Sequence, residues 1–156
     1  MVTQEELTGR VLKHAFISSS AHDSALVDKL VAVLVKNNIP VWIDSSGPQP
    51  RTPDLQESIR TAIAIQEAFV VIFAASPKAR RSIYVRAELA VATRNECSIL
   101  PVWIDGEDWI DCAPIELMNS QYVDCRQQAS SAGTDQLVKL VKAQMELKLP
   151  PTFSSD

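Results

Sequence analysis

The chain has 156 residues, a hydrophobic fraction of 46% and a formal net charge of −4, which together predict one globular domain. The negative charge argues against a protein that coats nucleic acid or an anionic membrane. No apolar run approaches the roughly 20 residues of a membrane-spanning helix, and the polar first ten residues are not typical of a signal peptide. We therefore expect a cytoplasmic protein that binds neither nucleic acid nor membranes.

The metal-binding residue types are sparse. Cys97, Cys112 and Cys125 follow no metal-ligand spacing, and an odd number of cysteines is typical of reduced thiols in the cytosol. The two histidines, His14 and His22, are too few for a multi-histidine metal centre. We expect no metal site and no resident cofactor.

Short apolar stretches alternate with amphipathic ones along the chain. We expect strands over 11–18, 39–44, 69–74 and 98–104 and a short strand at 122–123. Between and after them we expect helices over 26–35 (with an apolar stripe), 54–65, 82–95 and 134–149. A polar lead-in over 1–10, an irregular loop over 45–53 and a tail over 150–156 complete the chain. Asp23 is predicted to cap the first helix, and Asn37-Asn38 to end it.

This alternation of strand and helix predicts βαβ units with a five-stranded parallel sheet, flavodoxin-like in its winding, and helices on both faces. In such sheets ligands bind beyond the carboxyl ends of the strands. Polar residues follow the apolar strands at those ends, namely Ser18, Ser19, Ser20, Asp44, Ser76 and Asp105. Either these residues mark a functional edge, or the strands simply become polar where they reach water.

Several common nucleotide and hydrolase motifs are missing. The four glycines form no GxGxxG after the first strand, no GxxxxGK[ST] and no GxSxG. A dinucleotide-binding Rossmann domain, a P-loop NTPase and an α/β-hydrolase are therefore excluded. A response regulator is excluded as well, because serines follow the first strand and Ala-Ser-Pro follows the third, where that family needs acidic residues.

Four segments, read together and in order, resemble the Toll/interleukin-1 receptor (TIR) domain family. They are the FISSSAHD run over 16–23, the VWID strand over 41–44 with its proline-rich loop, Ser76-Pro77 followed by Ser82, Tyr84 and Glu88-Leu89, and the ILPV strand over 99–102. The resemblance implies a TIR domain over 11–149. Two departures are visible: Thr52 stands where the family's loop glycine is expected, with Gly47 nearer the strand, and Tyr84 replaces a tryptophan.

The resemblance implies one of two functions. Some TIR domains are adaptors that assemble with other TIR domains, whereas others cleave NAD+ at the nicotinamide–ribose bond. The enzymes carry a glutamate at the position of Glu88, which implies a catalytic role for it. One carboxylate suffices for this reaction, because nicotinamide leaves without protonation, unlike the leaving oxygen in glycoside hydrolysis.

The expected geometry is compatible with that role for Glu88. On a helix, Tyr84 and Glu88 share a face that borders the stripe of Val85, Leu89 and Ala92. A carboxylate at such a border is partly desolvated, which strengthens its electrostatic interactions. The alternative is an ordinary surface glutamate that pairs with Arg81 or Arg86.

Further residues are candidates for binding NAD+. Ser18, Ser19 and Ser20 have hydroxyl groups that could bind phosphate or ribose, or they form a serine-rich helix start. Asp44 either holds a ribose hydroxyl or caps its loop. Ser82 and Tyr84 belong to the Glu88 motif, and Trp109 resembles an aromatic residue that stacks near nicotinamide in family enzymes, although a packed tryptophan is more common. The cations Lys78, Arg80, Arg81 and Arg86 either attract phosphates or form a solvated loop.

These expectations give one leading hypothesis and two rivals. The first is an NAD+ hydrolase or cyclase of an immune or defence signalling protein, with NAD+ as substrate and activation by self-association into a homo-oligomer. The second is a non-enzymatic adaptor that acts through TIR–TIR assembly. The third is a regulator that mimics host TIR domains.

Overall fold

The computed structural model describes residues 12–43, 55–126 and 130–148. Its strands are β1 (His14–Ser18), β2 (Val41–Ile43), β3 (Ala68–Ala75), β4 (Ile99–Trp103) and β5 (Val123–Asp124). They form one sheet in the order β2-β1-β3-β4-β5, and every neighbouring pair is parallel. The predicted five-stranded parallel sheet is therefore confirmed.

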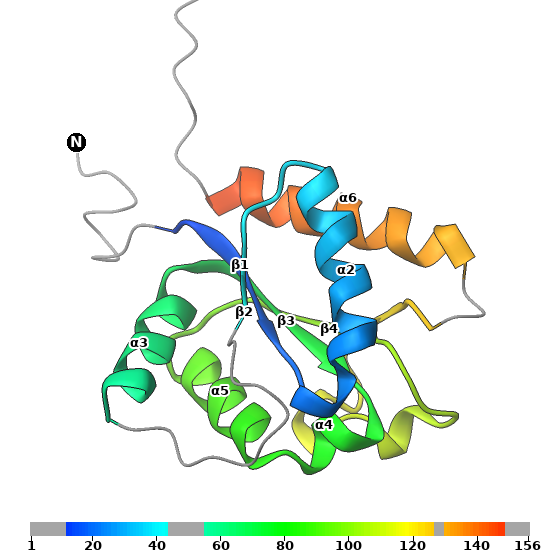
Figure 1. Ribbon diagram of the computed structural model, residues 1–156, viewed down its shortest axis with the longest axis horizontal. Helices are drawn as coiled ribbons and strands as arrows, with labels where there is room; N and C mark the ends of the chain where they lie inside the picture. The colour runs from blue at the N-terminus through cyan, green and yellow to red at the C-terminus, as the bar shows by residue number, and fades with distance from the viewer. Residues whose placement is uncertain (1–11, 44–54, 127–129, 149–156) are drawn as a thin grey trace, which may run out of the picture.

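Helices cover both faces of this sheet (Figure 1). They are α2 (Ser24–Lys36), α3 (Leu55–Gln66), α4 (Pro77–Arg81), α5 (Ile83–Arg94) and α6 (Ser130–Lys148), with short 3-10 turns η1 (Ala21–Asp23), η2 (Trp109–Asp111) and η3 (Ile115–Leu117). The pair α2 and α6 lies over one face, and the pair α3 and α5 lies over the other. None of these helices, within the described ranges, is long and apolar enough to cross a bilayer.

The central strand β3 explains why both layers form. All eight of its residues are buried, and alternate side chains point to opposite faces. Ile72 belongs to the core shared with α2 and α6, whereas Phe73 belongs to the core shared with α3 and α5. Each fully buried Ile or Phe side chain contributes about 1.5–3 kcal/mol relative to its exposed state. The continuous apolar run therefore fixes β3 at the centre of the sheet.

The strands and long helices lie where the sequence predicts them, with some shifted ends. The first strand begins at His14 instead of residue 11, and Tyr122 lies just outside β5. Helix α2 ends at Lys36 with Asn37 as its C-cap, as expected. Asp44 and the predicted loop over 45–53, which includes Gly47 and Thr52, lie outside the described residues.

Two helices differ from expectation for local reasons. Helix α4 was not predicted, because five residues are too few to show an apolar period. Its start is well defined, since Ser76 accepts a hydrogen bond from the Ala79 backbone and Pro77 occupies the first turn. Helix α6 begins at Ser130, before the predicted residue 134, and passes so close to β5 that a Cβ on Gly133 would lie 2.1 Å from the Asp124 carbonyl oxygen.

Candidate functional site

The carboxyl ends of the parallel strands meet along one edge of the sheet. Ser18 ends β1, Ser76 follows β3, and Asp105 follows β4 after one further residue. Because β1 and β3 are hydrogen-bonded neighbours, Ser18 and Ser76 lie at the same edge of the sheet. Both serines are buried. The polar ends of β1 and β3 therefore do not simply extend into water, whereas Asp105 beyond β4 is exposed.

Ser18 is hydrogen-bonded to Glu88. The Ser18 hydroxyl donates to Oε1 of Glu88 at 2.6 Å, across a separation of 70 residues. Val85, Leu89 and Ala92 of α5 pack on the sheet, and this stripe carries Glu88 to the carboxyl edge. The Glu88 residue is only 7% exposed. Glu88 is therefore a buried carboxylate with a defined partner and not an ordinary surface glutamate.

A second serine–carboxylate pair lies at the same edge. The Ser76 hydroxyl donates to Oδ2 of Asp23 at 2.5 Å, and Asp23 is 3% exposed. Burial raises the pKa of Asp23, while the Ser76 hydrogen bond and the charge of Lys78 act in the opposite direction. Asp23 does precede α2, but its side chain makes no capping hydrogen bond. The predicted capping role is wrong, because the carboxylate binds Ser76 instead.

Each of the two serine–carboxylate pairs joins the end of one strand, β1 or β3, to the segment that follows the other strand. Ser18 at the end of β1 donates to Glu88, which lies on the second helix after β3. Ser76 at the end of β3 donates to Asp23, which lies in the turn after β1. Each strand end is thereby bonded to the segment that follows the other strand. This arrangement fixes the β1–η1 segment relative to α4 and α5.

The other predicted residues on these segments have different surroundings. Ser20 is buried and accepts from the His22 backbone N–H, and Ser19 is half-buried. Ser82 is the N-cap of α5 and accepts from the Val85 backbone N–H. Tyr84 lies one turn before Glu88 on α5 and is 38% exposed, so its ring is accessible from solvent. Ser18 is thus a predicted serine that is hydrogen-bonded directly to Glu88.

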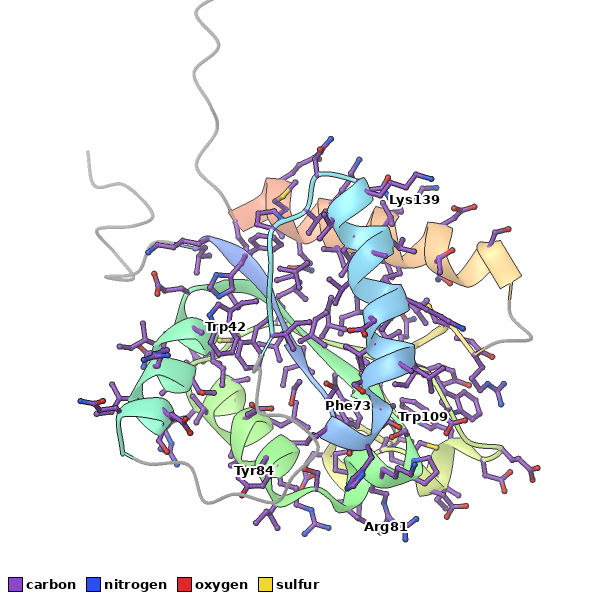
Figure 2. All side chains as sticks on the ribbon, in the orientation of Figure 1. Trp42, Phe73, Arg81, Tyr84, Trp109 and Lys139 are labelled. Atoms are coloured by element: carbon purple, nitrogen blue, oxygen red, sulfur yellow. The ribbon has the colours of Figure 1, made fainter. Side chains whose placement is uncertain are left out.

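Trp109 belongs to a separate aromatic group. Its ring stacks on Tyr122 at a centroid distance of 4.2 Å and meets Trp103 edge-on at 5.6 Å. Its Nε1 donates to the Met118 carbonyl oxygen at 3.1 Å. The guanidinium of Arg126 lies 3.5 Å from the centroid of the Trp103 ring. Figure 2 shows Trp109 and Tyr84 at different places in the lower part of the molecule.

The sequence offered little to identify Arg126. Arg126 donates to both carboxylate oxygens of Asp124, at 3.0 and 2.8 Å, and to the Gly106 carbonyl at 3.2 Å. This ion pair lowers the pKa of Asp124. The two residues are only two positions apart, but their joint role depends on Trp103, which is distant in sequence. The sequence Asp-Cys-Arg matches no known motif, so sequence analysis could not predict that this ion pair lies against Trp103.

Cys112 and Cys125 do not provide a thiolate nucleophile at this edge. Cys112 and Cys125 are free thiols, and Cys112 is buried. Burial raises the pKa of Cys112 and raises that of Cys125 to about 11. These two thiols therefore stay protonated at neutral pH, which makes them unreactive.

Comparison with known proteins places these features in a family. A model described as "TIR domain" matches residues 15–140. The fold is similar to the TIR domain of the Toll-related receptor TRR-2 from Hydra magnipapillata, with a TM-score of 0.63 at 16% identity, over 82% of this chain and 97% of that chain. It is also similar to the TIR domains of the activated Roq1 resistosome, with a TM-score of 0.50 at 15% identity, over 83% of this chain and 84% of that chain.

A flavodoxin-like domain from a Synechococcus species is a third neighbour. Its TM-score is 0.50 at 16% identity, over 89% of this chain and 95% of that chain. Identities this low show a shared fold and not a shared activity. A search of curated proteins finds no match to the sequence.

Proposed function

The chain belongs to the TIR domain family, and from that premise we propose that it cleaves NAD+ at the bond between nicotinamide and ribose. The observation that carries this proposal is the buried Glu88 carboxylate, held by the Ser18 hydroxyl at the carboxyl edge of the sheet. Ligands of open parallel sheets bind at that edge. A charged group in a partly water-excluded place is suited to stabilise opposite charge in a transition state.

The reaction makes modest demands on the protein. When the glycosidic bond breaks, the ring nitrogen of nicotinamide keeps the electron pair, so that nicotinamide leaves as a neutral molecule. The positive charge passes to the ribose, whose reacting carbon becomes oxocarbenium-like. Water then adds to that carbon and releases a proton, giving ADP-ribose, or an adenine nitrogen of the same molecule adds and gives a cyclic isomer. Neither route requires a general acid for the leaving group, in contrast to glycoside hydrolysis.

We assign the following roles to the residues of the site. Glu88 stabilises the positive charge on the ribose, and Ser18 holds the carboxylate in place through the bond to Oε1. Tyr84 borders the place where the substrate binds, and Ser19, Ser20 and Ser82 lie on the segments that flank it. NAD+ is the substrate, so the proposed chemistry needs no resident cofactor.

Self-association belongs to the same proposal. The Roq1 match is to TIR domains within an activated resistosome, and we propose that copies of this domain also activate by association. Trp109 packs with Trp103 and Tyr122, and we propose that a neighbouring copy supplies its aromatic contact to nicotinamide. We place the protein in immune or defence signalling.

A non-enzymatic adaptor is the rival function. Exposed apolar side chains near the edge, such as Ile83 and Ile115, favour a role in assembly whether or not NAD+ is cleaved. The two functions differ in one measurable way, since an adaptor associates without turning over NAD+.

The deciding experiment incubates concentrated protein with NAD+ and separates the nucleotide products by chromatography. The wild type is expected to release nicotinamide with ADP-ribose or its cyclic isomer. Glu88→Gln keeps the shape of the side chain and removes its charge, so the rate should fall about a hundred- to a thousandfold. Glu146→Gln, the same change at an exposed position of α6, serves as the matched control and should keep full activity.

The outcome separates the two functions. If Glu88→Gln melts like the wild type yet keeps more than about a third of the wild-type cleavage rate, the negative charge of Glu88 does not stabilise the transition state as proposed, and the mechanism is wrong. If the concentrated wild type produces no nicotinamide while still associating, the adaptor function replaces the enzymatic one.

A further inference from the structure

Two neighbouring segments carry opposite charge. The basic segment, residues 77–86, covers α4 and the start of α5, and its exposed cations are Lys78, Arg80, Arg81 and Arg86. The acidic segment, residues 105–116, follows β4, and its exposed carboxylates are Asp105, Glu107, Asp108, Asp111 and Glu116. Neither segment contains a residue of the other sign. The surface at this edge therefore has a positive half and a negative half.

Direct contacts join the two halves. Arg80 Nε donates to the Ala113 carbonyl oxygen at 3.2 Å, and a Cβ on Gly106 would lie 3.0 Å from Pro77. Both Lys78 and Asp105 act on the pKa of Asp23, which places their charges near the same buried carboxylate. Figure 2 shows Arg81 at the lower margin of the molecule, directed away from the sheet. The two segments thus lie side by side on the outside of one edge.

The charges of both segments are available for a partner. Within the ranges that the structure describes, none of these cations and carboxylates forms an ion pair. Apolar side chains stand among them, and they are unusually exposed for isoleucine: Ile83 at 69% in the basic segment, and Ile110 at 62% and Ile115 at 81% in the acidic segment. Large exposed apolar side chains set among polar ones are typical of protein interaction surfaces.

We infer that the basic and acidic segments form one self-complementary surface, through which two copies of this chain bind about a two-fold axis. An axis that runs in the interface along the boundary between the segments places the basic segment of each copy on the acidic segment of the other. The same operation brings Ile83 of one copy toward Ile110 and Ile115 of its partner, so apolar groups also meet. An interface of this kind is isologous and closes at two copies.

A second copy fits this surface better than a partner of one sign. A polyanion such as nucleic acid would be attracted by the basic segment and repelled by the acidic segment beside it. A second copy satisfies both halves at once, because it supplies each charge that the first copy presents. The chain as a whole carries a net charge of −4, so two copies repel at long range and their attraction has to be local. This inference gives a surface to the self-association proposed above and does not depend on NAD+ cleavage.

Charge reversal tests the inference. One variant combines Arg81→Glu with Arg86→Glu, and the other combines Glu107→Lys with Glu116→Lys. In a homodimer of either variant the facing segments have the same sign, so the association constant measured by sedimentation velocity should fall about tenfold or more. The wild type should show a monomer–dimer equilibrium that weakens when salt rises from about 0.1 M to about 1 M, since the Debye length shortens from about 10 Å to about 3 Å.

Mixing the two variants gives the sharpest result. An equimolar mixture should form heterodimers about as well as the wild type forms homodimers, because both contacts are again between opposite charges. Matched controls place the same charge changes on exposed residues of the opposite layer, Lys29→Glu with Lys36→Glu on α2 and Asp135→Lys with Glu146→Lys on α6, and should associate like the wild type. Thermal melting of each variant verifies that it is folded.

Specific outcomes would overturn the inference. They are a wild type that stays monomeric at the highest attainable concentration, charge-reversed variants that associate as strongly as the wild type, or a mixture no better than its components. Species that keep growing with concentration would exclude the two-fold closure. None of these readouts uses NAD+ turnover, so a dimeric but inactive protein would contradict the proposed catalysis and leave the interface standing.

Discussion

At the scale of single residues, the site depends on how one hydroxyl constrains one carboxylate. Ser18 is buried at the end of the rigid strand β1, and its donation to Oε1 of Glu88 limits the rotamers that the glutamate can adopt. A hydroxyl donor also stabilises the charged form of a carboxylate. If Glu88 acts on a developing positive charge, both effects favour reaction, because the charge is already placed before the substrate arrives.

Ser18→Ala tests this positioning role. The change removes one hydrogen bond to a charged group, which is worth about 1.5–3 kcal/mol, so kcat should fall roughly ten- to a hundredfold. KM should change less than kcat, because the bond orients the carboxylate and need not contact the substrate. Ser58→Ala, on the exposed surface of α3, is the matched control in steady-state kinetics. A Ser18→Ala variant with wild-type kcat and normal melting would show that Glu88 does not need this partner.

Sequence reasoning named both Glu88 and Ser18 as site residues but did not predict the hydrogen bond between them. The glutamate was predicted from its motif and from the border of an apolar stripe, which are local features of α5. The partner is 70 residues away, and the bond forms only because β1 and β3 are adjacent. For Asp23 the sequence predicted a wrong partner. Its position before α2 is that of a capping residue, but its carboxylate accepts a hydrogen bond from the buried Ser76 hydroxyl instead. In both cases the hydrogen-bond partner of the carboxylate is set by tertiary contacts and not by the local sequence.

At the scale of elements, helix α4 connects the site to the sheet. It was missed in the sequence because it has only five residues, although Ser76-Pro77 is a recognisable helix start. The Ser76 hydroxyl has two roles, since it accepts from the Ala79 backbone N–H and donates to Asp23. One side chain therefore both starts α4 and holds it against η1.

A comparison of two capping serines measures the second role. Ser76→Ala removes a cap, worth about 1 kcal/mol, and leaves the buried Asp23 without its hydroxyl donor, which costs a further 1–3 kcal/mol or so. Ser82→Ala removes only the cap of α5 and should cost about 1 kcal/mol. The free energy of unfolding from urea denaturation should therefore fall clearly more for Ser76→Ala. Equal losses would mean that the bond to Asp23 adds nothing to stability.

At the scale of the whole molecule, the sequence predicted the sheet but not the surface. Alternating strands and helices restrict the chain to few topologies, and the continuously apolar β3 belongs at the centre. The charges of the basic segment were visible in the sequence, yet only the folded chain shows that the acidic segment lies beside them. Which two segments are adjacent on the surface depends on how the loops that follow different strands pack together, and no local sequence pattern predicts this.

Association and catalysis should be coupled if the proposed enzyme is completed by a neighbouring copy. Specific activity should then rise with protein concentration, because mass action increases the dimer fraction. A sharper version mixes a small amount of wild type with a large excess of Glu88→Gln. The variant contributes no turnover of its own, but it can serve as the neighbour, so the rate per wild-type molecule should increase toward that of concentrated protein. Excess Glu88→Gln that also carries Arg81→Glu and Arg86→Glu should not activate, because its basic segment is reversed. A rate strictly proportional to wild-type concentration over a roughly hundredfold range, where mass action must shift the populations, would show that each copy acts alone.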